Sequence, residues 1–137
     1  MFFVKNKNNE YIKRYITVQF QKEGIHCFPG ASSEKFSTND WDDVSFLKYP
    51  HMHYFYFKVT IEVMENDREI EFIQFRRWLE RLYDEKTLNL NNKSCEMMGE
   101  DLLNKIKQKY PNRYIKIEIY EDNINGGIIE YFPNDKK

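Results

Sequence analysis

Apolar and polar residues alternate over residues 11–20, where Ile12, Ile16, Val18 and Phe20 share one face, and again over a longer run from residue 51 to residue 63. Because successive side chains of a β-strand point to opposite faces, both segments are predicted to be strands with one buried face. In the longer strand this face begins with His51 and His53 and continues through five apolar side chains. Gly24 permits a bulge or bend after the first strand.

Two later segments place apolar residues three and four positions apart, which predicts amphipathic helices. The apolar stripes are Phe72, Phe75, Leu79 and Leu82 in the first helix, and Met98, Leu102 and Ile106 in the second. Ser94 is a good N-cap for the second helix, and Glu96 favours its positive first turn. Pro111 ends that helix.

The last part of the chain is predicted to be a hairpin. Residues 115–120 alternate isoleucines with polar residues, residues 125–127 (Asn-Gly-Gly) suit a turn that needs positive φ, and residues 128–132 return. The order strand, strand, helix, helix, strand, strand predicts an α+β domain over residues 1–137. We expect an antiparallel four-stranded sheet with two helices on one face.

Charge and hydropathy exclude some classes of protein. With 21 basic and 22 acidic residues, the chain lacks the basic surplus typical of nucleic-acid binding. Its apolar runs are too short to cross a membrane. Residues 1–4 are apolar and precede the first lysines, which is the reverse of a secretory signal. We therefore expect a cytoplasmic protein, in which Cys27 and Cys95 are free thiols.

The three histidines suggest a metal site. His51 and His53 lie two apart on a strand and point the same way, and His26 could join them from a neighbouring strand. Three protein ligands and an open position are typical of a catalytic zinc, so zinc is the expected cofactor. The alternative is that all three are ordinary surface or core histidines.

Several further side chains are candidates for binding a small molecule. Glu121 continues the inward face of the third strand, where a carboxylate could accept two N–H bonds from a heterocyclic ring edge; alternatively, it is a solvated turn residue. Ser94 and Glu96 lie at a helix N-terminus, which can hold an anion or can simply be capped. Tyr54 could stack on a base. Arg76, Arg77 and Arg81 form either a solvated face or a phosphate site.

These features resemble the tunnelling-fold family of 6-pyruvoyl- and 6-carboxytetrahydropterin synthases. In that family one His ends the first strand and an H-x-H opens the second, as His26 and His51-Met52-His53 do here. Ile70-Glu71-Phe72 is similar to its turn into the first helix, Lys93-Ser94-Cys95-Glu96 to its P-T-x-E motif, and Glu121 to its substrate-gripping glutamate. The resemblance implies zinc on the three histidines, a pocket between subunits, and a ring-like or barrel-like homo-oligomer, a tetramer or hexamer.

The resemblance fails at the catalytic positions. The family's catalytic cysteine is replaced by Leu47. Of the family's Asp-His pair, only the Asp has a counterpart in this chain, Asp84. Asp84 and Cys27 are thus weak candidates for catalysis. The leading hypothesis is an oligomeric, catalytically degenerate protein that binds a purine-, pterin- or nucleotide-like ligand, by analogy with small phage proteins that sequester nucleotide signals. The alternatives are a zinc-dependent lyase or hydrolase and an interaction module with an empty pocket.

Overall fold

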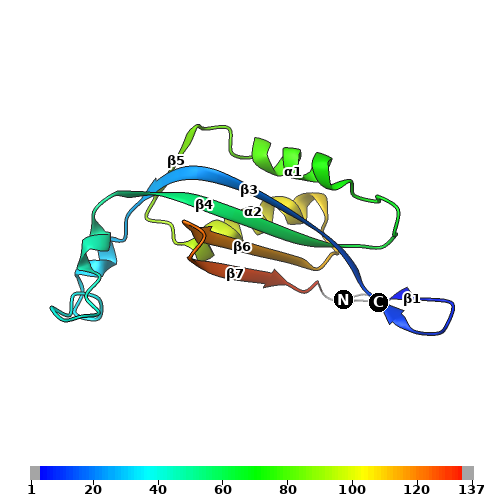
Figure 1. Ribbon diagram of the computed structural model, residues 1–137, viewed down its shortest axis with the longest axis horizontal. Coiled ribbons are helices and arrows are strands. Elements are labelled where there is room, and N and C mark those ends of the chain that lie inside the picture. Colours follow the sequence, from blue (N-terminus) through cyan, green and yellow to red (C-terminus); the bar gives the residue numbers. More distant parts are fainter. Residues whose placement is uncertain (1–3, 134–137) are drawn as a thin grey trace.

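The computed structural model describes residues 4–133, and its main feature is a five-stranded sheet in the order β5-β3-β4-β6-β7 (Figure 1). Four of these strands pair antiparallel: β3 (Arg14–His26), β4 (His51–Val63), β6 (Ile115–Glu121) and β7 (Asn125–Tyr131). The fifth, β5 (Thr87–Asn91), runs parallel to the end of β3. A separate two-stranded sheet pairs β1 (Val4–Lys5) with β2 (Tyr11–Ile12).

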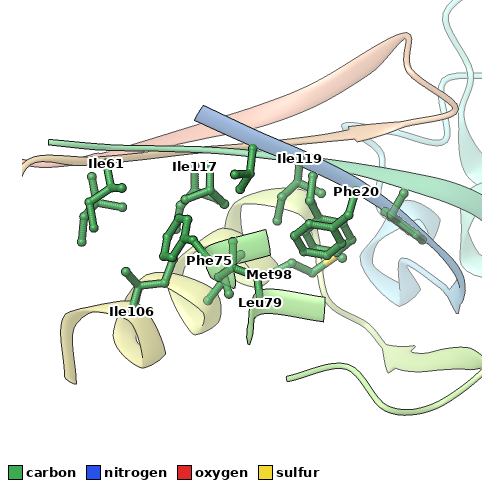
Figure 2. Close-up of a cluster of buried hydrophobic side chains, with 14 of the residues drawn as sticks. Phe20, Ile61, Phe75, Leu79, Met98, Ile106, Ile117 and Ile119 are labelled. Atoms are coloured by element: carbon green, nitrogen blue, oxygen red, sulfur yellow. The ribbon is translucent and has the colours of Figure 1, made fainter. Parts of the chain in front are cut away.

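The two helices cover one face of the sheet (Figures 1 and 2). α1 (Phe72–Arg81) packs against β3, and α2 (Cys95–Lys109) packs against β6 and β7. As expected, the Ser94 side chain caps α2 by accepting a hydrogen bond from the Met97 N–H at 3.1 Å. Between β3 and β4 the chain forms an arm beyond the end of the sheet, with two short 3₁₀ helices, η1 (Pro29–Ser32) and η2 (Ser45–Lys48).

The structure is α+β, but the expected antiparallel four-stranded sheet is wrong. The sheet is mixed and five-stranded, because residues 87–91 add β5 in parallel to β3. Leu88 and Leu90 are buried while their polar neighbours point away from the core. Burial of these two leucines next to β3 explains why a segment between the two helices forms a strand. The register shift between β3 and β5 falls between Ile25 and His26 and skips Leu90 of β5. Gly24 pairs regularly with both His53 and Leu88, so the bulge predicted at this glycine is wrong.

The hairpin turn also differs from its prediction. Glu121 pairs with Asn125, so the turn comprises residues 122–124, with positive φ at Asp122 and Asn123. Gly126 and Gly127 lie within β7, and no glycine among the described residues has positive φ. A Cβ on Gly126 would lie 2.1 Å from the Ile119 carbonyl oxygen. Close approach of two backbones therefore explains this glycine, rather than a turn.

The core lies between the sheet and the helices (Figure 2). The inward side chains of β4 and β6 are almost fully buried: Phe55, Phe57, Val59 and Ile61, with Ile115, Ile117 and Ile119. They meet Phe75 and Leu79 from α1 and Met98, Leu102 and Ile106 from α2, as the helical spacing predicted. Phe72 is an exception, since it is 55% exposed.

At the end of the sheet away from the histidines, a buried carboxylate is paired. Glu62, only 1% exposed, forms an ion pair with Lys13 and accepts a hydrogen bond from the Tyr114 N–H at 3.2 Å. Arg113 donates to the Glu62 carbonyl and forms an ion pair with Glu69. Glu69 in turn accepts from the Met64 N–H. These contacts stabilise the connection between β4 and α1.

Neither α1 nor α2 has the length and apolar character that a membrane-crossing helix requires, and no other described segment is such a helix. The absence of a secretory signal was inferred from residues 1–4. Residues 1–3 lie outside the part of the chain that the structure describes.

Candidate metal centre and adjoining cavity

Pairing of β3 with β4 brings the three histidines together. His26, the last residue of β3, is directly opposite His51, the first residue of β4, and His53 follows two positions along the same face. The ring centroids are 4.6 Å apart for His26 and His51, 5.3 Å for His26 and His53, and 5.0 Å for His51 and His53. Each residue has a nitrogen within 4.8 Å of those of the other two. The three side chains therefore lie close enough to hold one metal ion.

Each imidazole is anchored through its Nδ1 atom. Nδ1 of His26 lies 2.8 Å from the Lys93 carbonyl oxygen, and Nδ1 of His51 lies 2.7 Å from that of Tyr49. Nδ1 of His53 lies 2.7 Å from a carboxylate oxygen of Asp122. Carbonyl and carboxylate oxygens only accept hydrogen bonds, so each Nδ1 carries the proton and a neutral ring keeps its lone pair on Nε2.

The Nε2 atoms of His26 and His53 are buried and have no hydrogen-bond partner among the described residues. Leaving a buried polar atom unpaired is costly, and such an atom needs an explanation. A metal ion supplies one, because metal-bound histidines donate the other ring N–H to a carbonyl or carboxylate. Three imidazole nitrogens suit zinc, among other transition metals.

Glu121 lies beside these imidazoles. Its carboxylate oxygens are 3.2 Å from Nε2 of His26 and 3.5 Å from Nε2 of His53. Interaction with Glu121 raises the pKa of His26, although burial acts in the opposite direction. The interaction with His26 lowers the pKa of Glu121, again against burial. Because β6 extends to Glu121, which pairs with Phe55, this carboxylate is on the inward face and is not a turn residue.

Asp122 was not identified from the sequence. One of its carboxylate oxygens accepts from His53, and the other accepts from the Tyr54 N–H at 3.0 Å. The bond to His53 lowers the pKa of Asp122. Its position at the end of β6 was visible, but only the pairing of β4 with β6 brings it to His53.

A cavity of about 400 Å³ adjoins the histidines at the N-terminus of α2. Its walls come from the ends of β3, β4 and β6, from the arm, and from the start of α2. Its polar side chains include His26, His51, Asn92, Ser94, Glu96, Glu121 and Asn125, and its apolar ones include Phe28, Leu47 and Met97. Small-molecule sites have volumes in this range, about 300–1,000 Å³, and combine apolar walls with a few polar groups.

Both cysteines line this cavity. Cys95 is buried, with its sulfur 4.0 Å from a Glu121 oxygen. Burial, followed by the charges of Glu121 and Glu96, raises the pKa of Cys95 to about 12, so its thiol stays protonated and unreactive. Cys27 is half-buried. Leu47, which takes the position of the catalytic cysteine in the family that the sequence resembles, also lines the cavity.

Other candidate residues lie elsewhere. Asp84 is exposed between α1 and β5, and Tyr54 is 48% exposed on the helix-free face of β4. Neither lines the cavity, and neither do Arg76, Arg77 and Arg81. Arg76 pairs with Glu80 at 3.9 Å on the surface of α1, which fits the solvated-face interpretation.

The His26–Glu121 pair should make metal-free stability depend on pH. The pKa of His26 in the folded state lies above 6.5. The stability that this residue contributes to the metal-free fold is therefore fully present below pH 6.5 and is lost as pH rises through the raised pKa. The stability that Glu121 contributes is present above pH 4.5 and is lost as pH falls through its lowered pKa. Zinc binding requires neutral histidines and should strengthen as pH rises.

Thermal unfolding against pH, with and without zinc, tests this expectation. The difference in midpoint between the metal-free parent and His26→Gln should shrink above pH 6.5, whereas zinc stabilisation of the parent should grow. A metal-free difference that is constant with pH would contradict the assigned interaction.

No protein-family model matches the chain. No curated protein matches it either. Among solved structures, the crystal structure of an uncharacterized protein from Wolinella succinogenes is similar, with a TM-score of 0.57 and 13% sequence identity. The match covers 86% of this chain and 98% of that chain. This similarity shows a shared fold only, and the relation to tetrahydropterin synthases stays a prediction.

Proposed function

We propose that this protein binds zinc at His26, His51 and His53 and holds a small purine-, pterin- or nucleotide-like ligand in the adjoining cavity. The observation that carries the proposal is the set of three clustered imidazoles, each with Nδ1 anchored to an oxygen. Such anchoring orients a histidine for coordination through Nε2. When bound, zinc would supply Lewis-acid polarisation of a ligand oxygen.

The chemistry of the cavity supports a flat, polar ligand. Glu96 and Glu121 supply carboxylates that could accept paired N–H groups from the edge of a heterocyclic ring. Phe28, Leu47 and Met97 provide apolar surface against which such a ring could pack. Glu121 also corresponds to the glutamate that grips the ring in the family that the sequence resembles.

Three positions where a proton-transferring group could be expected favour binding without turnover. Leu47 replaces the family's catalytic cysteine in the cavity wall, and Asp84 lies outside the cavity. The high pKa of Cys95, about 12, makes it a poor nucleophile. Since general acid–base groups contribute about 10²–10⁴ in rate, their loss would largely abolish the family's reaction.

The proposal includes a homo-oligomer, in which a second copy of the chain covers the arm and the open side of the cavity. Trp41 is 90% exposed on this arm, Phe46 64% and Tyr49 63%. Large aromatic side chains exposed together are typical of interaction surfaces. Phe28 and Leu47 of the same arm line the cavity, so a neighbouring copy on the arm would lie next to the ligand.

A second candidate function is a zinc-dependent lyase or hydrolase of the tetrahydropterin synthase type. One observation favours it: Cys27 directly follows His26 and its half-buried side chain lines the cavity. A thiol there could act on a ligand held beside the histidines.

Native mass spectrometry of protein purified without chelator tests the proposal, followed by titration with neopterin and guanosine monophosphate. We expect a retained or added small molecule, and binding weakened at least tenfold by Glu96→Gln. Glu100→Gln, an exposed site one turn further along α2, should bind normally. Zinc-dependent conversion of dihydroneopterin triphosphate would instead support the lyase. Absence of any bound small molecule in all these measurements would contradict both functions.

A further inference from the structure

We propose that Glu121 is a fourth ligand of this metal site, an inference that rests on the proposed zinc binding. Zinc–ligand bonds of about 2.0–2.1 Å place neighbouring ligand atoms of a tetrahedral site about 3.3 Å apart. Oε2 of Glu121 lies 3.2 Å from Nε2 of His26, and Oε1 of the same carboxylate lies 3.5 Å from Nε2 of His53. Each distance is close to the separation expected between two ligand atoms of one ion.

The protonation of the imidazoles also favours this role. At 3.2 Å the Glu121 oxygen is close enough to His26 for a hydrogen bond, yet Nε2 has no hydrogen-bond partner. The same holds for Nε2 of His53 at 3.5 Å. With its proton on Nδ1, a neutral imidazole presents only a lone pair at Nε2, and a carboxylate oxygen also only accepts, so these two atoms cannot hydrogen-bond to each other. Two lone-pair atoms at this separation are expected where both are directed at a shared cation.

The backbone holds Glu121 in this position. It is the last residue of β6, where it pairs with Phe55 of β4 and Asn125 of β7. Phe55 itself is fully buried and follows His53 on the same face. The strand that carries two of the histidines thus also fixes the register of the glutamate.

A fourth protein ligand would change how the site works. Structural zinc sites have four protein ligands, whereas catalytic sites keep one position open. With Glu121 on the metal, the resting site is closed, and a ligand ring that uses this carboxylate must first displace it from the metal. Ligand binding and four-ligand coordination would then compete for one side chain.

Metal titration of the full chain tests this inference with cobalt(II) and zinc as probes. We expect the parent to give the intense visible spectrum of four-coordinate cobalt, and Glu121→Gln to give a weaker, shifted one. Zinc affinity, from competition with a chromophoric chelator, should fall by more than the roughly 10- to 100-fold typical of losing an outer-shell partner. Glu118→Gln, on the same strand but the opposite face, should leave both readouts unchanged.

Circular dichroism of the metal-free variants establishes that they are folded, and Glu121→Asp, which shortens the reach of the carboxylate, is the second variant. If the parent binds zinc but both Glu121 variants match it in spectrum and affinity, Glu121 is not a ligand and the three-histidine site stands. If the parent itself binds no zinc, both this inference and the proposed function are overturned.

Discussion

Saturating zinc is expected to raise the thermal unfolding midpoint of the parent chain by about 10 °C or more, and to have no such effect on His53→Ala. A ligand that binds only the folded state at 1,000 times its dissociation constant stabilises it by about 4 kcal/mol. In a domain of this size each kcal/mol corresponds to a few degrees. His53 carries one of the two buried Nε2 atoms that have no hydrogen-bond partner among the described residues, so its replacement removes one proposed ligand and the contact with Asp122.

Met52→Ala is the matched control for this experiment. Met52 lies between the two histidines of β4, points to the other face and is 53% exposed. We expect its zinc-dependent shift to equal that of the parent in a differential scanning measurement. A full shift in His53→Ala, or its loss in Met52→Ala, would contradict the assignment of the ligands.

Glu62→Ala is expected to destabilise the fold by about 3–5 kcal/mol, the usual cost of removing one partner of a buried ion pair. Glu62 is 1% exposed, pairs with Lys13 and accepts from the Tyr114 N–H. Its removal also takes away the acceptor of the buried Tyr114 N–H, and an unsatisfied buried donor is costly. Urea unfolding with linear extrapolation measures the difference.

Glu100→Ala serves as the comparison for Glu62→Ala. Glu100 is exposed on α2, and surface substitutions of this kind usually change stability by about 0.5 kcal/mol or less. Should Glu62→Ala cost no more than Glu100→Ala, the buried pair would contribute nothing to stability, and the description of this end of the sheet would be wrong.

Those parts of the fold that depend on local periodicity could be predicted from the sequence. Alternation over residues 51–63 predicted β4 with its boundaries, and helical spacing predicted the buried stripe of α2. The clustering of the histidines followed from the same reasoning. Residues two positions apart on a strand share a face, and a neighbouring strand can present a third histidine to that face. The structure adds the register, with His26 opposite His51.

Features that depend on contacts between distant segments could not be predicted in this way. Leu88 and Leu90 alternate with polar residues, but five residues do not reveal that they pair in parallel with β3. The oxygens that anchor the histidines come from Tyr49, Lys93 and Asp122, and two of them are backbone carbonyls with no sequence signature. The close approach of Gly126 to the Ile119 carbonyl oxygen follows only from the pairing of β6 with β7. Sequence reasoning therefore assigned this glycine to a turn.

The most direct test of the metal centre is the zinc content of the chain, measured by elemental analysis after expression without chelator and after zinc reconstitution and dialysis. Our interpretation predicts one zinc per chain in the parent and in Met52→Ala, and none when His26, His51 and His53 are replaced together by alanine. A parent chain without zinc after reconstitution, or a triple variant that retains it, would contradict the proposed site.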